Sequence, residues 1–199
     1  MGKEGLIIAG AGGHGVSVLD AALSAGSFDV LGFLDDWLPE GSRVLNFPVL
    51  GRVNRVTDFV SENIGFVVGL GQIKSPDQRV ALYKRITQSG GKMATILAST
   101  AYVSPYASIG PGSAVLHGAV VNARAVIGEN CIINSMALVE HDATVGAHSH
   151  VATGARINGG AAIGQESFIG SGAIVIQESS VPHNSVITAG AVIRNRKEK

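Results

Sequence analysis

The chain has 199 residues with 15 basic and 15 acidic side chains, so its formal net charge is zero, and this balance argues against a nucleic-acid or membrane surface that acts through bulk charge. The single cysteine excludes an intramolecular disulfide and fits a reducing compartment. The apolar run near the N-terminus is too short for a signal peptide or a membrane span, so we expect a soluble, cytoplasmic protein.

The first half of the chain alternates between predicted strands and helices. Residues 6–9 form an uninterrupted apolar run, which is typical of a strand buried on both faces of a parallel sheet. Three further segments are predicted as strands: 30–34, 66–70 and 93–98. Helices are predicted at 16–26, 53–63 (a weak pattern) and 76–90, and residues 48–51 as a loop or short strand. Residues 1–98 therefore predict an α/β, Rossmann-like βαβ domain.

A glycine motif, Gly10-x-Gly12-x-x-Gly15, joins the first predicted strand to the first predicted helix. Such glycines allow close backbone approach, and a helix N-terminus offers free N–H groups to a phosphate. Asp35 follows about 20 residues on, as in dinucleotide sites. The motif could instead be a turn that only packs the helix on the strand. Because the domain is half the size of a doubly wound fold, we expect a mononucleotide or nucleotide-sugar rather than NAD.

A six-residue period governs the second half. An aliphatic residue stands at every sixth position from Val103 to Ile193, and a small residue follows four positions after each aliphatic. Short strands joined by corners every six residues close a triangle after three strands, and stacked coils lie about 4.8 Å apart. Residues 99–199 are therefore predicted to form an all-β parallel β-helix of about five coils. One face is predicted to stack Val103, Val121, Val139, Ile157 and Val175.

His141 is a candidate general base. It lies at an outward corner of the predicted β-helix, between Glu140 and Asp142. A carboxylate that orients an imidazole supports base catalysis, although an ordinary surface histidine would have the same spacing. Three other outward histidines lack acidic neighbours and are predicted to be surface residues: His117, His148 and His183. Histidine spacing predicts no metal site, and Cys131, at a small inward position, is predicted to fill space rather than act as a nucleophile.

A surface for self-association is predicted beside His141. The outward residues there are small or apolar: Met136, Leu138 and Ala152. Such a face suits another copy of the chain better than water. We expect three β-helices around a common axis, so that a neighbour covers each His141 corner.

Three stretches together resemble a known family: Ile8-Ala-Gly-Ala-Gly-Gly-His-Gly15, Phe33-Leu-Asp-Asp36, and Asn134 through Glu140-His-Asp142 to His150. They resemble the sialic-acid O-acetyltransferase and nucleotide-4-amino-sugar N-acetyltransferase group of hexapeptide acyltransferases, over nearly the whole chain. The resemblance implies a left-handed β-helix and a homotrimer with acetyl-CoA bound between neighbouring β-helices. It also implies a nucleotide-sugar held by the N-terminal domain.

The resemblance further implies residue roles. The catalytic base falls on His141 and its acidic partner on Asp142, with Glu140 also in the site. The nucleotide-sugar side is assigned to Gly12, Gly13, His14, Asp35, Asp36 and Asn134. The acetyl-CoA side is assigned to His150, Gly170 and Ser171. A backbone N–H or His150 would polarise the acetyl oxygen.

The resulting hypothesis is an acetyl-CoA-dependent N-acetyltransferase that acts on the amino group of a UDP-linked 4-amino sugar, in bacterial surface-glycan or glycoprotein sugar biosynthesis. Its expected partners are acetyl-CoA, the nucleotide-sugar and two further copies of the chain, with no metal, nucleic acid or membrane. One alternative is an O-acetyltransferase acting on sialic acid or a related hydroxyl, since both acceptors need the same base and donor. Another is a non-catalytic, nucleotide-sensing β-helix scaffold, which would release no thiol.

Overall fold

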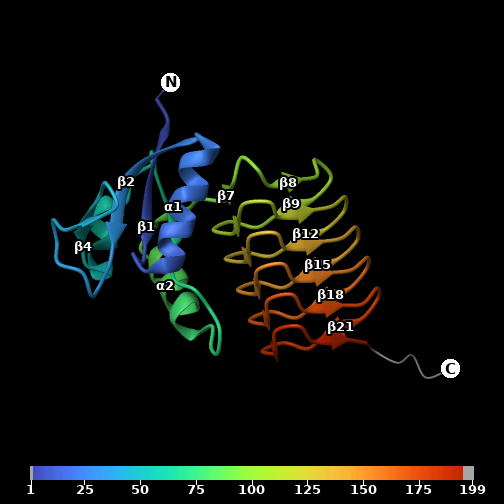
Figure 1. Cartoon of the computed structure of the whole chain (residues 1–199). Helices are drawn as coiled ribbons and strands as arrows, with labels where there is room; N and C mark the ends of the chain where they lie inside the picture. Colours follow the sequence, from blue (N-terminus) through green and yellow to red (C-terminus); the bar gives the residue numbers. More distant parts are fainter. Residues whose placement is uncertain (1, 195–199) are drawn as a thin grey trace.

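A parallel sheet forms the N-terminal part of the chain and lies beside a prism of stacked coils (Figure 1). The structure is a computed structural model and describes residues 2–194. The central strand β1 (Glu4–Ala9) pairs in parallel with β2 (Phe28–Leu34) and with β5 (Ile64–Val68). The outer strands are β4 (Phe47–Gly51), β3 (Arg43–Val44) and β6 (Lys92–Met93), in the order β3-β4-β2-β1-β5-β6.

Helices cover both faces of this sheet, as the uninterrupted apolar run of β1 predicts. Leu6 and Ile8 pack under helix α1 (Gly13–Ala25), whereas Ile7 and Ala9 face the other way. That second face is covered by the 3-10 helix η1 (Val53–Phe59) and by helix α2 (Asp77–Gln88). Alternate residues of one strand thus belong to two different cores.

Three parallel sheets form the sides of the prism, and each strand is two residues long. Face 1 comprises β7 (Ile96–Leu97), β10 (Ala114–Val115), β13 (Ile132–Ile133), β16 (His150–Val151), β19 (Phe168–Ile169) and β22 (Val186–Ile187). Face 2 comprises β8 (Tyr102–Val103), β11 (Val120–Val121), β14 (Leu138–Val139), β17 (Arg156–Ile157), β20 (Ile174–Val175) and β23 (Val192–Ile193). Face 3 comprises β9 (Ser108–Ile109), β12 (Val126–Ile127), β15 (Thr144–Val145), β18 (Ala162–Ile163) and β21 (Ser180–Val181).

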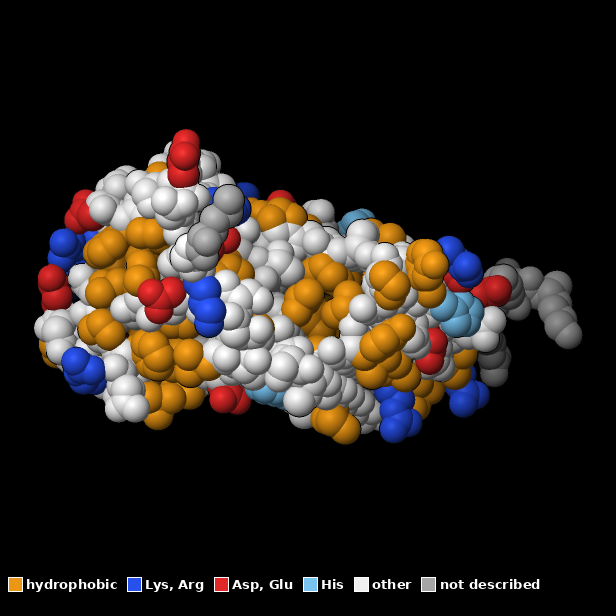
Figure 2. Space-filling model, turned by 90° about the horizontal axis from the view of Figure 1, so that it is seen from above, with side chains coloured by type: hydrophobic (Ala, Val, Ile, Leu, Met, Phe, Trp, Pro, Cys, Tyr) orange, Lys and Arg blue, Asp and Glu red, His pale blue; other side chains and the backbone are white. Residues whose placement is uncertain are grey.

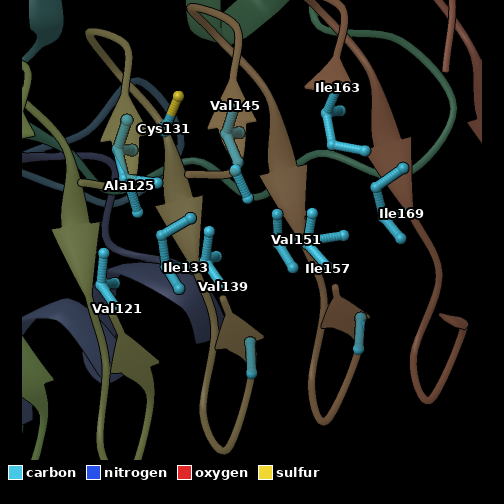
Figure 3. Packing of buried hydrophobic residues seen from close by; sticks show 14 of the residues in the cluster. Val121, Ala125, Cys131, Ile133, Val139, Val145, Val151, Ile157, Ile163 and Ile169 are labelled. Atoms are coloured by element: carbon cyan, nitrogen blue, oxygen red, sulfur yellow. The ribbon is translucent and has the colours of Figure 1, made fainter. Parts of the chain in front are cut away.

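The bore of this left-handed β-helix is filled as predicted. Val121 pairs with Val103 on one side and with Val139 on the other, so like stacks on like. The aliphatic side chains point inward together with the small ones (Figure 3), and Cys131 is fully buried among them. The stack contains five complete coils and two further strands, because β7 already pairs with β10 at Ile96.

The corners of the prism depend on a left-handed backbone. The third residue after an inward aliphatic has a positive φ at corner after corner, including 60° at Arg124 and 61° at Asp142. Equivalent corners stack by backbone hydrogen bonds: Asp142 donates to Ala123, and Gly160 donates to His141. Side chains one coil apart at a corner are therefore brought into direct contact.

The N-terminal part docks on face 1 and buries it. Helix α1 packs against β7, and the outward residues of the first four strands of this face are buried: Ile96, Ala114, Ile132 and His150. Arg79 of α2 is 1% exposed and donates to the backbone oxygen of Asn130 at 2.9 Å and to its Oδ1 at 2.8 Å. This burial lowers the pKa of Arg79 to about 10. A buried guanidinium thus fastens the sheet to the β-helix.

Docking overturns two predictions. His148, predicted as a surface residue, is buried because α2 covers it, and its Nδ1 lies 3.0 Å from the Asn130 amide. Ala152, predicted to be outward beside His141, is only 4% exposed, at a corner that borders face 1. Both side chains leave the bore as the repeat predicts, but His148 is covered by α2 and Ala152 is buried at its corner.

Local differences from the predicted elements are small. The strand predicted at 93–98 is split into β6, which joins the open sheet, and β7, which joins the β-helix. Residues 48–51 form a parallel strand, and β3 adds one antiparallel pair at the sheet edge. The division into domains at residue 98 stays a prediction. Among residues 2–194, no helix is both long and apolar enough to span a bilayer.

Candidate active site

The corner between β14 and β15 joins His141 to two charged side chains. His141 Nδ1 lies 2.7 Å from Asp142 Oδ2. Arg124, stacked on Asp142 from the preceding coil, donates from Nε to Oδ1 at 2.6 Å and from Nη2 to Oδ2 at 2.7 Å. Arg124, followed by His141, holds the pKa of the Asp142 carboxyl well below its usual range. We call these three residues the His141 corner.

The hydrogen bonds of the His141 corner define which ring nitrogen can accept a proton. An ionised carboxylate only accepts, so in the neutral imidazole Nδ1 carries the hydrogen and Nε2 has the lone pair. The side chain of His141 is 59% exposed, so Nε2 can be reached by a substrate. A carboxylate that orients an imidazole in this way is the arrangement of a general base.

Gly159 makes room for the imidazole of His141. A Cβ at Gly159 would lie 2.9 Å from both Cε1 and Nε2 of the ring, so only glycine allows this position. Among the described residues, the N–H of Gly159 has no acceptor. Gly159 was not predicted as a site residue, although it lies one full coil beyond His141 and the period could have identified it.

Glu140 supports the corner through the backbone. Its Oε2 accepts from Asn122 Nδ2 at 2.9 Å and from the His141 N–H at 3.3 Å, so it does not touch the imidazole ring. Of the two acids predicted around His141, Asp142 contacts the ring and Glu140 contacts the main chain.

A second group of predicted site residues gathers where face 1 meets the N-terminal part. His150 donates from Nδ1 to the Gln72 carbonyl at 2.7 Å, since a carbonyl only accepts. Its Nε2 must then accept from Asn134 Nδ2 at 3.0 Å. The ring of His14 lies 6.4 Å from that of His150, and its buried Nε2 has no partner among the described residues. We call these four residues the junction cluster.

Burial keeps both histidines of the junction cluster neutral. It lowers the pKa of His14 to about 3, with Arg79 and His150 adding smaller contributions, and that of His150 to about 4. Both ring nitrogens of His150 are already hydrogen-bonded. His150 therefore has no free ring nitrogen, whereas the Gly159 N–H has no acceptor among the described residues.

The neutral histidines predict that stability falls on acidification. Below about pH 6.5 the unfolded chain protonates both residues while the folded chain does not, so unfolding is favoured as pH falls toward 4. The free energy of unfolding should drop by up to about 1.4 kcal/mol per pH unit for each histidine. Urea melts from pH 7.5 to 4.5 would measure this slope. His150→Asn should make the slope shallower, whereas His183→Asn, at an exposed position, should not; equal slopes in all three proteins would contradict the assignment.

The His141 corner and the junction cluster occupy opposite edges of face 2. His141 lies between faces 2 and 3, whereas Asn134 lies between faces 1 and 2, beside the N-terminal part. Gly170 and Ser171 follow β19 and lie at that second edge too. A Cβ at Gly170 would lie 2.5 Å from the Ala189 backbone nitrogen, so this glycine is also required for stacking. One chain therefore does not bring the predicted acetyl-CoA residues to its own His141.

A cavity of about 310 Å³ opens at the carboxyl ends of the central strands. Its lining includes Gly10, Asp36, Trp37, Leu70 and Arg85. Strands β2 and β5 leave β1 on opposite sides, and ligands of open α/β sheets bind at this kind of switch point. Asp36 was predicted as a site residue, whereas Trp37 and Arg85 were not, because nothing in their spacing indicates the cavity.

The two predicted aspartates differ in their bonding. Asp35 is buried, and its oxygens accept the N–H groups of Ala11, Trp37 and Leu38 at 2.8–3.0 Å. It therefore braces the glycine loop. Asp36 accepts from the Val53 N–H with Oδ1 alone. Its second oxygen is the better placed to meet a ligand.

The glycines of the loop also divide into two kinds. A Cβ at Gly15 would lie 2.1 Å from the Gly10 carbonyl oxygen, and Gly10 itself has a φ of 111°. Packing and backbone conformation therefore require glycine at both positions. A Cβ at Gly12 or Gly13 would meet nothing within 4 Å. Glycine at these two positions is left unexplained by packing, and open space there fits the approach of a phosphate.

Comparisons with known proteins cover nearly the whole chain. A family model described as the PglD N-terminal domain matches residues 5–86, and one described as bacterial transferase hexapeptide (six repeats) matches residues 124–159. The acetyltransferase domain of PglB from Neisseria gonorrhoeae FA1090 is 35% identical to this chain, with a TM-score of 0.89, over 96% of this chain and 92% of that one. The same domain in complex with acetyl coenzyme A gives 35% identity and a TM-score of 0.90, over 97% and 92%. PerB from Caulobacter crescentus in complex with CoA and GDP-perosamine is 28% identical with a TM-score of 0.86, over 96% and 88%.

Proposed function

We propose that this chain, which belongs to the same hexapeptide-repeat acetyltransferase family as the PglB domain, transfers the acetyl group of acetyl-CoA to the amino group of a nucleotide-linked amino sugar. The observation that carries the proposal is the His141 corner. It presents an oriented imidazole with a free Nε2 beside an N–H of the next coil that has no acceptor among the described residues. These are the base and the oxyanion donor that acyl transfer to an amine requires.

The acceptor is proposed to bind through its nucleotide at the cavity beside Asp36, with the phosphates on Gly12 and Gly13. We take UDP as the nucleotide and a 4-amino sugar as the acceptor. The related PerB structure contains GDP-perosamine, so GDP-sugars are the first alternative. A sugar hydroxyl, as in sialic acid, is the second, because the same base would serve it.

In the proposed mechanism the sugar amine attacks the thioester carbon while His141 Nε2 accepts the amine proton. The Gly159 N–H donates to the developing oxyanion, which is stabilisation that typically contributes a factor of about 10²–10³. Collapse of the tetrahedral intermediate breaks the C–S bond, and the imidazolium returns its proton to the CoA thiolate. Asp142 stabilises the transient imidazolium. No acyl-enzyme forms; Cys131 is fully buried, and burial raises the pKa of its thiol to about 11.

We propose that the active site is shared between copies of the chain in a cytoplasmic homotrimer. The supporting observation is that the His141 corner and the junction cluster occupy opposite edges of face 2 in one chain. The outward residues of face 2 are mostly apolar: Tyr102, Val120, Leu138, Ile174 and Val192. Seen from above, hydrophobic side chains lie over both the N-terminal half and the β-helix half of the molecule (Figure 2). A second copy on this face would bring its junction cluster toward His141.

The function is tested by thiol release from acetyl-CoA against a panel of UDP- and GDP-linked amino sugars, free amino sugars and sialic acids. Turnover with a nucleotide-linked amine, and its loss when the amine is replaced by a hydroxyl, is the expected result. Faster turnover with a sialic acid would select O-acetylation. Absence of thiol release with every acceptor would leave the scaffold alternative.

Gly13→Val should weaken nucleotide-sugar binding without unfolding the protein. The side chain would enter space that is open in the structure and that a phosphate is proposed to occupy. Calorimetry should show at least about a tenfold rise in the Kd of the nucleotide-sugar, since losing even one hydrogen bond to a charged group costs about 1.5 kcal/mol. Binding of acetyl-CoA should not change.

Gly15→Ala is the contrasting variant, because its Cβ would overlap the Gly10 carbonyl. It should lower the melting temperature, which Gly13→Val should not. Unchanged nucleotide-sugar affinity in Gly13→Val would show that the loop only packs the helix on the strand.

A further inference from the structure

Arg124 makes the most specific polar contact at the His141 corner, and nothing in the mechanism above uses it. Its guanidinium meets both oxygens of Asp142 in a two-pronged pair at 2.6 and 2.7 Å. Asp142 Oδ2 is shared, because it also lies 2.7 Å from His141 Nδ1. The three side chains therefore form a continuous chain from cation to carboxylate to imidazole. Arg124 is 70% exposed, so packing does not account for its position.

The Asp142 carboxylate orients the imidazole, but its charge has a second effect on the ring. A negative charge in contact with an imidazole favours the protonated ring, and a protonated ring cannot accept a proton from the substrate. A cation on the far side of the same carboxylate offsets that charge while leaving the hydrogen bond to Nδ1 in place. The bidentate fork also fixes the carboxylate plane, which a lysine could not do.

We propose that Arg124 is a positioning residue for acetyl transfer: it fixes Asp142 against His141 Nδ1 and offsets the carboxylate charge, so that the imidazole is oriented without being held as imidazolium. This inference rests on the proposed function, since it assigns His141 the role of base. Arg124 acts through Asp142 and does not need to touch either substrate.

Other charged groups near His141 are arranged differently. Glu140, on the same turn, is bonded to Asn122 and to the His141 main chain. Glu178 follows one coil beyond Gly160, with its Cγ 3.6 Å from where a Cβ of that glycine would lie. Both side chains are acidic, so, like Asp142, they favour the protonated form of the His141 ring. Among residues 2–194, Arg124 is the cation in direct contact with Asp142.

The test compares pH–rate profiles of the wild type with those of Arg124→Gln and Arg124→Lys at saturating substrates. In Arg124→Gln the acid limb of kcat should move up by about 0.5–1 pH unit, the size expected for losing one exposed charge a few ångströms away. Below the limb kcat should therefore fall about three- to tenfold further than on the high-pH plateau, which itself falls because the Asp142 carboxylate is no longer held against His141 Nδ1. Arg124→Lys should restore the limb, and both KM values should stay within about twofold in each variant.

An NMR titration of the His141 ring separates this inference from the proposed function, because it needs no turnover. The midpoint of this titration should move upward in Arg124→Gln and should not move in Arg43→Gln, which removes a distant charge. In an Asp142→Asn background, adding Arg124→Gln should change the midpoint little. A uniform loss of kcat at every pH with an unmoved midpoint, or a wild-type profile, would overturn the proposal. Should Arg124→Gln fail to fold, Arg124→Asn supplies the same loss of charge with a residue that tolerates the φ of 60°. Failure of the wild type to release thiol would count against the acetyltransferase function alone.

Discussion

His141→Ala is expected to lower kcat by at least about 10²-fold, because a positioned general base typically contributes 10²–10⁴-fold to the rate. The side chain is 59% exposed and fills no part of the bore, so the fold and the melting temperature should not change. Acetyl-CoA binding measured by calorimetry should also be retained. Single-turnover measurements would show the loss in the chemical step rather than in product release.

Cys131→Ala is the control for this experiment. The thiol lies in the bore, where alanine occupies the equivalent positions at 125 and 137, so the variant should fold and turn over normally. A His141→Ala protein with more than about a tenth of the wild-type kcat would exclude His141 as the base. An inactive, folded Cys131→Ala protein would instead favour an acyl-enzyme on the thiol.

Leu138→Glu is expected to give a folded but inactive monomer. Leu138 lies on the outward side of β14, while its neighbours Ala137 and Val139 fill the bore and remain unchanged. A carboxylate on this apolar face would have to be buried without a partner in a trimer, which costs several kcal/mol at each seam. Sedimentation should report the mass of one chain, circular dichroism should retain the β-helix signal, and thiol release should fall by at least about 10²-fold because base and substrate residues are no longer brought together.

Leu23→Glu is the matched control, since Leu23 is an exposed leucine on α1 rather than on face 2. It should leave mass and activity unchanged. A Leu138→Glu protein that remains both trimeric and active would remove the shared site, and so would a wild-type monomer with full activity.

The β-helix could be predicted almost completely from the sequence, because its period fixes which side chains enter the bore. The stack of Val103, Val121 and Val139 follows from spacing alone. The same spacing could have identified Arg124 and Gly159, which lie one coil before Asp142 and one coil after His141. Contacts between coils are thus readable from sequence once the period is known.

The burial of face 1 could not be predicted in this way. The repeat indicates that His148 and His150 leave the bore, but not that the N-terminal part covers them. Covering depends on Arg79 and α1, which meet the β-helix through tertiary contacts with no local signal. The role of Asp35 was ambiguous for a related reason, since a carboxylate after a strand can bind a ribose or the main chain.

The stacked corners make the coil the unit of permissible length change. Adding one complete coil of 18 residues shifts everything downstream by about 4.8 Å along the β-helix axis and leaves each side chain on the same face. Adding six residues between Arg124 and His141 would instead rotate everything downstream by one side of the prism and carry the imidazole of His141 away from Arg124. Insertions and deletions between Val103 and Ile193 should therefore be tolerated only in multiples of three strands. The rise per coil therefore sets the distances between the residues of the His141 corner.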